Sequence, residues 1–98
     1  MAEIKLELDE KKHGAFNLYD NGTKIGEMVI GIKDDLLTVY HTEVDENQSG
    51  KGYAKLLLDA LTDYARTNKL GVRPLCAYVH AQFKKHHDEY ADIWQKED

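Results

Sequence analysis

The fold is decided within one stretch of sequence, residues 41–55, which reads His41-Thr42-Glu43-Val44-Asp45-Glu46-Asn47-Gln48-Ser49-Gly50-Lys51-Gly52-Tyr53-Ala54-Lys55. Before this stretch apolar residues alternate with polar ones, and after it they recur every three or four positions. The first pattern predicts β-strands and the second predicts an α-helix. Residues 41–55 are therefore expected to form the end of a strand, a polar loop with two glycines and the start of a helix.

Four β-strands are expected upstream. Residues 1–8 alternate apolar and charged side chains, which predicts a half-buried first strand. A second strand around residues 16–19 is followed by Asn21-Gly22, a pair that favours the type I′ turn of a β-hairpin. The hairpin leads into a third strand over residues 24–33, and a fourth strand runs over residues 36–44. The short links between these strands predict an antiparallel meander.

One long helix is expected downstream, over residues 53–67. Its apolar stripe consists of Ala54, Leu57, Leu58, Leu61 and Ala65. Thr62 is expected on the opposite, solvent-facing side, and Asn68 is expected to end the helix in a left-handed conformation. Residues 72–79 predict a fifth strand, parallel to the fourth because a helix crosses over between them, and residues 81–88 predict a second helix.

Size and composition restrict the class of protein. The 98 residues suit one α/β (α+β) domain, residues 1–98, with one modest core. A net charge of −5 disfavours nucleic acids and anionic membranes as partners. The single cysteine, Cys76, excludes a disulfide framework and a multi-cysteine zinc site, so no metal is expected. Because we find no signal peptide and no apolar run near the roughly 20 residues of a membrane span, we expect a cytoplasmic protein. We expect it to be a monomer or a weak homodimer.

The glycine-bearing loop before the long helix is a candidate anion site. Free N–H groups and the positive end of the helix dipole attract anions, and Lys51 and Lys55 add positive charge. The loop lacks the third glycine of a dinucleotide fingerprint and the Gly-Lys-Ser/Thr of a P-loop. A diphosphate ligand and a plain helix-entry loop both remain open on these residues alone.

Several motifs resemble the GNAT-type acetyltransferases. Ser49-Gly50-Lys51-Gly52-Tyr53-Ala54 is similar to their coenzyme-A pyrophosphate loop, Arg/Gln-x-x-Gly-x-Gly/Ala, with Ser49 in the Arg/Gln position. Three further segments resemble the very small members of the family: His41-Thr42-Glu43-Val44, Pro74-Leu75-Cys76-Ala77-Tyr78-Val79 and His87-Asp88-Glu89-Tyr90. Together the segments cover nearly the whole chain in order and spacing.

The resemblance implies a GNAT-like acyl-CoA N-acyltransferase fold. In that fold the fourth and fifth strands splay apart, and the pantetheine arm of acetyl-CoA lies in the gap. The diphosphate would rest on the backbone amides of residues 50–54. The residues implied to bind coenzyme A are Thr42, Glu43, Val44, Ser49, Gly50, Lys51, Gly52, Tyr53, Ala54, Lys55 and Tyr78.

Two residues are candidates for catalysis. The resemblance places Cys76 near the thioester, where a thiolate would accept the acetyl group and pass it on. His41 is the candidate base for that thiol or for an acceptor amine. From the residues alone, an isolated cysteine such as Cys76 is more often a small buried side chain, here on the fifth strand. By alternation His41 shares a strand face with Val39 and Glu43, an assignment that a β-bulge would change.

The acceptor is the least defined part of the prediction. In most GNAT enzymes two helices between the first two strands form much of the acceptor site, whereas residues 9–14, which are too few for two helices, join those strands here. We expect an acetyl-CoA-binding protein that transfers acetyl to an unidentified amine or thiol acceptor, either through Cys76 or directly with the help of His41 or a water. The missing half of the acceptor site is expected to be a protein partner, an exposed cleft or Cys76 itself. Two alternatives remain open: a non-catalytic sensor or carrier of acetyl-CoA, and a thiol-reactive or redox protein that uses Cys76.

Overall fold

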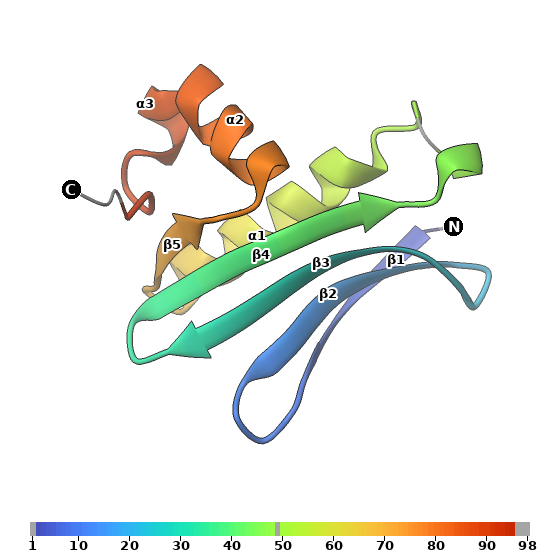
Figure 1. Ribbon diagram of the computed structural model, residues 1–98, viewed down its shortest axis with the longest axis horizontal. Helices are drawn as coiled ribbons and strands as arrows, with labels where there is room; N and C mark the ends of the chain where they lie inside the picture. The colour runs from blue at the N-terminus through green and yellow to red at the C-terminus, as the bar shows by residue number, and fades with distance from the viewer. Residues whose placement is uncertain (1, 49, 96–98) are drawn as a thin grey trace.

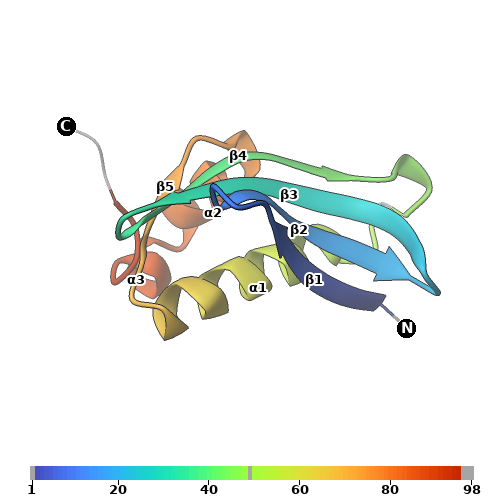
Figure 2. The same cartoon turned by 90° about the horizontal axis from the view of Figure 1, so that it is seen from below.

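A computed structural model describes residues 2–48 and 50–95, and it consists of a five-stranded sheet with one long helix on one face (Figures 1 and 2). The strands lie across the sheet in sequence order; β1 to β4 are antiparallel, and β4 and β5 are parallel. The elements are β1 (Ala2–Leu8), β2 (His13–Asp20), β3 (Thr23–Lys33), β4 (Leu36–Val44), η1 (Glu46–Gln48), α1 (Tyr53–Thr67), β5 (Gly71–Pro74), α2 (Ala77–Lys85) and α3 (His87–Tyr90). The predicted meander with one parallel strand pair around a central helix is confirmed.

The turns of the meander have the local chemistry that the sequence predicts. Asn21 and Gly22 both have positive φ, 52° and 82°, as a type I′ turn requires. Asp34 also has a positive φ, 55°, in the turn between β3 and β4. These tight turns place each strand beside the preceding one.

The core lies between α1 and the sheet. Four of the five residues predicted for the apolar stripe of α1 are buried, namely Leu57, Leu58, Leu61 and Ala65, and the fifth, Ala54, is half-buried at the start of the helix. The four buried residues pack in one cluster with the sheet residues Phe16, Leu18, Met28, Ile30, Leu37 and Val39. Each large apolar side chain buried in this way contributes about 1.5–3 kcal/mol.

Thr62 of α1 is buried, contrary to the prediction that it faces solvent. Its hydroxyl donates a hydrogen bond of 3.1 Å to the backbone carbonyl of Asp59, one turn earlier in the same helix. This internal bond satisfies the polar group, so a threonine is tolerated beside the apolar stripe. The sequence pattern misassigned Thr62 because it ranks side chains by polarity alone.

The end of α1 also differs from the prediction by one residue. Asn68 has a φ of −100°, and the residue with positive φ is Lys69, at 56°. Asn68 instead donates from its backbone N–H and its side-chain amide to the carbonyl of Tyr64. The left-handed residue therefore follows the cap.

The strand β4 contains one residue more than the part of β3 that it faces. Ile30 pairs with Val39, whereas the adjacent Val29 pairs with His41. Tyr40 is thus left without a partner in β3, which makes it the extra residue of a β-bulge. Its side chain is 51% exposed.

The bulge changes which side chains of β4 face the core. Beyond it, Thr42 and Val44 are half-buried on the side of Val39, while His41 and Glu43 are exposed on the opposite side. The predicted alternation, which put His41 and Glu43 on the face of Val39, is therefore wrong. One inserted residue is sufficient to exchange the faces because side chains alternate with a period of two.

The fifth strand is shorter than predicted. β5 ends at Pro74, and α2 begins at Ala77, whereas the sequence pattern predicted a strand over residues 72–79 and a helix only from residue 81. Proline has no N–H to continue the ladder. The apolar residues Val79 and Phe83 lie one helical turn apart and are fully buried, so they follow a helical rather than a strand period.

The outer edge of β5 is covered by the end of the described chain. The N–H of Val72 donates to the carbonyl of Ile93 at 2.7 Å, and the N–H of Gln95 donates to the carbonyl of Val72 at 2.8 Å. Trp94 forms a parallel bridge with Val72 and packs against Phe83, with ring centroids 5.9 Å apart. This segment thereby closes one edge of the sheet.

Candidate functional site

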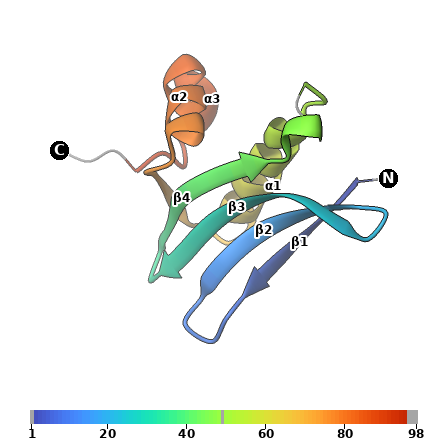
Figure 3. The ribbon, with the colours of Figure 1, turned by 45° about the vertical axis from the view of Figure 1, so that its right-hand side comes forward.

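The two halves of β4 have different neighbours. β5 pairs with Leu36–Val39, in the register Leu36 with Gly71 through Val39 with Pro74. The chain then leaves the sheet to form α2, while β4 continues to Val44. Figure 1 shows β4 running on past the end of β5, and in Figure 3 the far end of β4 leads into the short helix η1. Among residues 2–48 and 50–95, no strand pairs with the second half of β4 on the side away from β3.

The loop after β4 leads into α1 through two glycines in a left-handed conformation. The φ angles are 81° at Gly50 and 77° at Gly52, which is the N-cap of α1. The first helical hydrogen bond runs from the N–H of Leu56 to the carbonyl of Gly52. The N–H groups before Leu56 have no acceptor within the helix, and the N-cap residue, a glycine, has no side chain that could cap them.

The space in front of these glycines is open. A Cβ atom built on Gly50 or Gly52 would meet no atom within 4 Å. Both positions therefore require glycine because of their backbone angles and not because of crowding. The free N–H groups and the positive end of the helix dipole make this loop able to bind an anion.

The two lysines of the loop already have polar partners. The ammonium group of Lys51 donates to the side-chain carbonyl of Gln48 at 3.0 Å, and that of Lys55 lies 2.5 Å from a carboxylate oxygen of Asp59. The hydrogen bond to Asp59 raises the pKa of Lys55. An anion at the loop would have to compete with these contacts for the lysines. The predicted site residue Ser49 lies outside the described residues.

Cys76 lies between the end of β5 and the start of α2. It is the N-cap of α2 and has an extended backbone, so the positive end of that helix dipole faces it. The N–H of Cys76 donates to the carbonyl of Val39 at 2.9 Å, which ties the residue to β4 at the point where β4 and β5 separate. Cys76 is thus a helix cap; the prediction that it lies on a strand is wrong.

The thiol of Cys76 contacts β4 through one side chain. Its Sγ lies 3.2 Å from Oγ1 of Thr42, and Cys76 is 6% exposed. The contact depends on the β-bulge, because the bulge turns Thr42 inward. The structure therefore brings together two of the predicted site residues, Cys76 and Thr42, that are 34 positions apart in the sequence.

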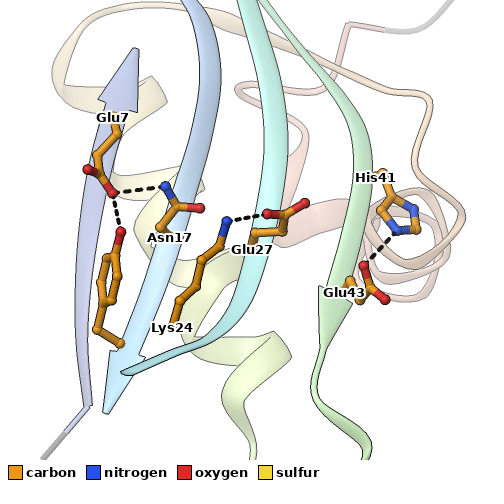
Figure 4. Close-up of polar contacts among 7 residues, drawn as sticks. Glu7, Asn17, Lys24, Glu27, His41 and Glu43 are labelled. Carbon is orange, nitrogen blue, oxygen red and sulfur yellow. Dashed lines mark hydrogen bonds and ion pairs between the residues drawn. The ribbon is translucent and has the colours of Figure 1, made fainter. Parts of the chain in front are cut away.

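His41 and Glu43 lie on the other face of the sheet. Their side chains are 62% and 70% exposed, and Nε2 of His41 is 3.8 Å from Oε2 of Glu43. Figure 4 shows both among the polar side chains of this outer face, with Glu7 and Glu27. The structure does not bring His41 to Cys76, so His41 is not placed to take a proton from the thiol.

The remaining predicted residues that the structure describes lie at the end of β4, at the start of α1 and in the first turn of α2. Tyr78 is half-buried in the first turn of α2, and burial raises the pKa of its phenol. Val44 is half-buried at the end of β4, and Tyr53 and Ala54 are half-buried at the start of α1. The role of the Val39 carbonyl could not be predicted, since a backbone acceptor that anchors a distant residue leaves no signal in residue types.

Residues 2–48 and 50–95 contain no group of three or more His, Cys, Asp or Glu side chains arranged to hold a metal ion. No helix in this part of the chain is long and apolar enough to cross a membrane.

A family model agrees with this geometry. Residues 15–93 match the model described as GCN5-related N-acetyl-transferase. The match includes the bulged strand, the glycine loop, α1 and Cys76. No match to a curated protein sequence was found.

Solved structures share the fold. A GCN5-like protein from Staphylococcus aureus, solved by NMR, is 25% identical over 98% of this chain and 90% of its own length, with a TM-score of 0.68. A ribosomal-protein-alanine N-acetyltransferase from Brucella melitensis is 21% identical, with a TM-score of 0.65, over 91% of this chain. The ribosomal-protein-S18-alanine N-acetyltransferase from Escherichia coli is 20% identical, with a TM-score of 0.61, over 65% of this chain.

The last two enzymes are longer than this chain. The match spans 66% of the Brucella enzyme and 42% of the Escherichia coli enzyme. At about one fifth sequence identity these two likenesses show a shared fold. The Staphylococcus aureus protein, by contrast, matches over nearly its whole length.

Proposed function

Because the chain belongs to the GCN5-related N-acetyl-transferase family, we propose that it transfers an acetyl group from acetyl-CoA to an amine or thiol acceptor by way of Cys76. The observation that carries the proposal is the position of Cys76, at the point where β4 and β5 separate and in contact with Thr42. Acetyl-CoA supplies an activated thioester. The chain must hold that thioester beside the thiol and direct the acetyl group onward.

The glycine loop suits the diphosphate of acetyl-CoA. Open space in front of Gly50 and Gly52 and free N–H groups at the start of α1 fit an anionic ligand. In this arrangement Lys51 and Lys55 leave Gln48 and Asp59 to meet the phosphates. The pantetheine arm then follows the half of β4 beyond the bulge towards Cys76.

The transfer takes place in two steps, acetylation of Cys76 and transfer of the acetyl group to the acceptor. The Cys76 thiolate attacks the acetyl carbonyl carbon, so the bond from Sγ to carbon forms while the bond from carbon to the coenzyme-A sulfur breaks. Coenzyme A leaves as a thiolate and takes up a proton, which the protonated phenol of Tyr78 can supply. The acceptor then attacks the carbonyl carbon of the acetylated cysteine, and the bond from that carbon to Sγ breaks, which regenerates the Cys76 thiolate. The proton that the acceptor loses returns through solvent to the Tyr78 phenolate, so both residues are restored.

The acceptor would approach from the outer face of the sheet. Only a short turn joins β1 to β2, since β2 begins at His13. No pair of helices therefore lies between these strands to enclose an acceptor. His41 and Glu43 are exposed on the outer face, away from the thiol, so they serve a direct transfer without Cys76, in which they would take the proton of an amine that attacks acetyl-CoA itself.

Intact-mass spectrometry after incubation with acetyl-CoA tests the relay. We expect one acetyl unit on the wild-type chain and none on Cys76→Ala, with His41→Ala retaining the adduct because His41 faces away from the thiol. If Cys76→Ala transfers acetyl to an amine panel at the wild-type rate, the relay is refuted in favour of direct transfer.

Binding measurements distinguish the alternatives. If the protein binds acetyl-CoA tightly but neither transfers nor hydrolyses the acetyl group, it is a sensor or carrier of acetyl-CoA and not an enzyme. Failure to bind coenzyme A at all would contradict the whole proposal and leave a thiol-reactive protein. Isothermal titration calorimetry with acetyl-CoA, coenzyme A and wild-type protein provides this measurement.

A further inference from the structure

The strand β1 is the open edge of the sheet. It lies at one end of the strand order, and β2 is its partner on the inner side (Figure 2). The opposite edge, β5, is covered by residues 93–95. Within residues 2–48 and 50–95, no segment pairs with the outer side of β1. The described part of the chain thus closes one edge of its sheet and leaves the other open.

β1 lacks most of the devices that protect edge strands. It has seven residues, it contains no proline, and its register with β2 runs without a bulge from Ala2–Asp20 to Leu8–Gly14. A long, regular edge strand is a template for pairing with another strand. Only its charged residues, Glu3, Lys5 and Glu7, oppose unspecific pairing.

The backbone groups that face the open edge can be assigned. The N–H of Asp9 donates to the carbonyl of His13, which continues the β1–β2 ladder, and a Cβ on Gly14 would lie 1.9 Å from the carbonyl oxygen of Glu7. Odd-numbered residues of β1 therefore direct their backbone N–H and C=O groups to β2. Since the direction of these backbone groups alternates along an antiparallel strand, Ile4 and Leu6 direct theirs to the open edge.

The side chains of β1 divide between the two faces. Ile4, Leu6 and Leu8 are half-buried on the side of the core, at the margin of the main cluster. Lys5 and Glu7 are exposed on the outer face. There Glu7 accepts hydrogen bonds from Tyr19 at 2.6 Å and Asn17 at 2.9 Å, as Figure 4 shows, and these bonds lower its pKa. Glu7 therefore stays ionised and fixed in place.

These features make β1 complementary to itself. In an antiparallel pair related by a two-fold axis at Leu6, Leu6 faces Leu6 of the second copy, and Ile4 faces Leu8. In the same register Lys5 of each copy faces Glu7 of the other, which gives two opposite-charge pairs. Moving the axis to Lys5 would instead oppose Lys5 to Lys5 and Glu3 to Glu7, which are like charges.

We propose that β1 is a self-association surface, on which a second copy of this chain adds its own β1 antiparallel with the two-fold axis at Leu6. The two sheets then become one continuous sheet, and the half-exposed apolar rows of both copies are buried together. The interface is isologous, so it closes at two copies. It is formed by one short strand from each side and falls below about 1,200 Å², so the dimer is weak and depends on protein concentration. This proposal does not depend on acetyl transfer.

Sedimentation equilibrium tests the charge pairing. The wild-type chain is expected to dimerise with a dissociation constant of about 10–1,000 µM, the range of small transient interfaces. Lys5→Glu places a carboxylate opposite Glu7 of the other copy at both ends of the pairing, and this repulsion should weaken the dimer at least about tenfold. Lys33→Glu makes the same change in net charge at an exposed position of β3 and should leave the association unchanged. A wild-type chain that is monomeric at millimolar concentration, or equal dimerisation by Lys5→Glu, would overturn the proposal.

Cysteine cross-linking tests the register. In a Cys76→Ser background, Leu6→Cys places the two sulfur-bearing residues opposite each other with Cα atoms about 5.5 Å apart, within disulfide range. Lys5→Cys places them roughly 8 Å apart, beyond that range. We expect an oxidised dimer of Leu6→Cys and little of Lys5→Cys. Faster cross-linking by Lys5→Cys, or by Ile4→Cys, contradicts the assigned axis.

Discussion

The two halves of β4 are one continuous strand, but their surroundings differ. Leu37 and Val39, in the half that pairs with both β3 and β5, are fully buried. Beyond the bulge, Tyr40 is 51% exposed and the side chain of His41 is 62% exposed. The paired half supports the fold, and the half with an open side presents the groups that can meet a ligand. The half with an open side is therefore the half at which we propose that the ligand binds.

The largest expected effect lies in the paired half. Leu37→Ala leaves a cavity beneath α1 and should lower the free energy of unfolding by about 2–5 kcal/mol. Glu43→Ala, at an exposed position of the open half, should change it by less than about 0.5 kcal/mol. Urea denaturation followed by circular dichroism measures both. Similar losses in the two variants would break the distinction between the halves.

The next effect concerns the loop that follows the open half. Gly52→Asp puts a side chain and a negative charge where the diphosphate is proposed to bind, and should weaken acetyl-CoA binding at least about tenfold, or 1.4 kcal/mol. Gly22→Asp is a matched control, because Gly22 also has a positive φ, 82° against 77°, and nothing within 4 Å of a built Cβ.

Both glycine variants should lose stability through backbone strain of about 1–2 kcal/mol. Only Gly52→Asp should lose affinity in calorimetric titration with acetyl-CoA. Equal affinities in the two variants would mean that the loop does not hold the diphosphate.

A smaller effect is expected at the contact across the open half. Thr42→Val keeps the shape of the side chain but removes the hydroxyl next to Sγ of Cys76. The reactive thiolate can only accept a hydrogen bond, so the Thr42 hydroxyl stabilises it by donating one. Losing a hydrogen bond of about 0.5–1.5 kcal/mol should make the alkylation of Cys76 by iodoacetamide about two- to tenfold slower at pH 7. Because the chain has one cysteine, intact-mass spectrometry reports this rate directly.

Two variants control for the loss of a threonine. Thr42→Ser keeps a hydroxyl and should react at nearly the wild-type rate. Thr62→Val removes a buried hydroxyl of α1 that bonds to Asp59 and should also leave the rate unchanged. A Thr42→Val chain that reacts like the wild type would show that the hydroxyl does not influence the thiol.

The smallest effect concerns the segment that covers β5. Arg66 donates to both carboxylate oxygens of Asp92, and these hydrogen bonds lower the pKa of Asp92. Stability from a lowered carboxylate pKa is present above the unfolded value and is lost as the pH falls through the folded value. Since the side chain of Asp92 is 57% exposed, Asp92→Asn should cost less than about 1 kcal/mol at pH 7.

Acid titration of stability measures this effect. Between about pH 5 and pH 2, Asp92→Asn should lose part of the pH dependence seen in the wild type. Asp35→Asn, at an exposed position in the turn before β4, serves as control and should retain the dependence. Identical acid curves for the wild type and Asp92→Asn would show that this pair does not fasten the segment.

Much of the fold could be predicted because its signals are local. The alternation of residues 1–8, the Asn21-Gly22 turn and the stripe of α1 each depend on neighbours a few positions apart. The glycine loop was also predicted, and Gly50 and Gly52 adopt the left-handed angles that glycine permits. Such features depend only on the residues that form them, so a short stretch of sequence is sufficient to predict each one.

The faces of β4 and the length of β5 could not be predicted in this way. The bulge at Tyr40 has no signature in residue type, yet it decides that Thr42 faces the core and His41 faces outward. Residues 74–79 carry enough apolar side chains for either a strand or a helix. The burial of Val79 and Phe83 against the sheet selects the helix.

The sequence by itself determined the order of the elements, the turns and the resemblance to an acetyltransferase family, because periodicity and turn chemistry act over short separations. Only the tertiary structure decided that Thr42 meets Cys76, that His41 does not, and that one sheet edge is covered while the other stays open. Those outcomes depend on the register between strands and on packing between segments distant in the chain. Neither is encoded at any single position.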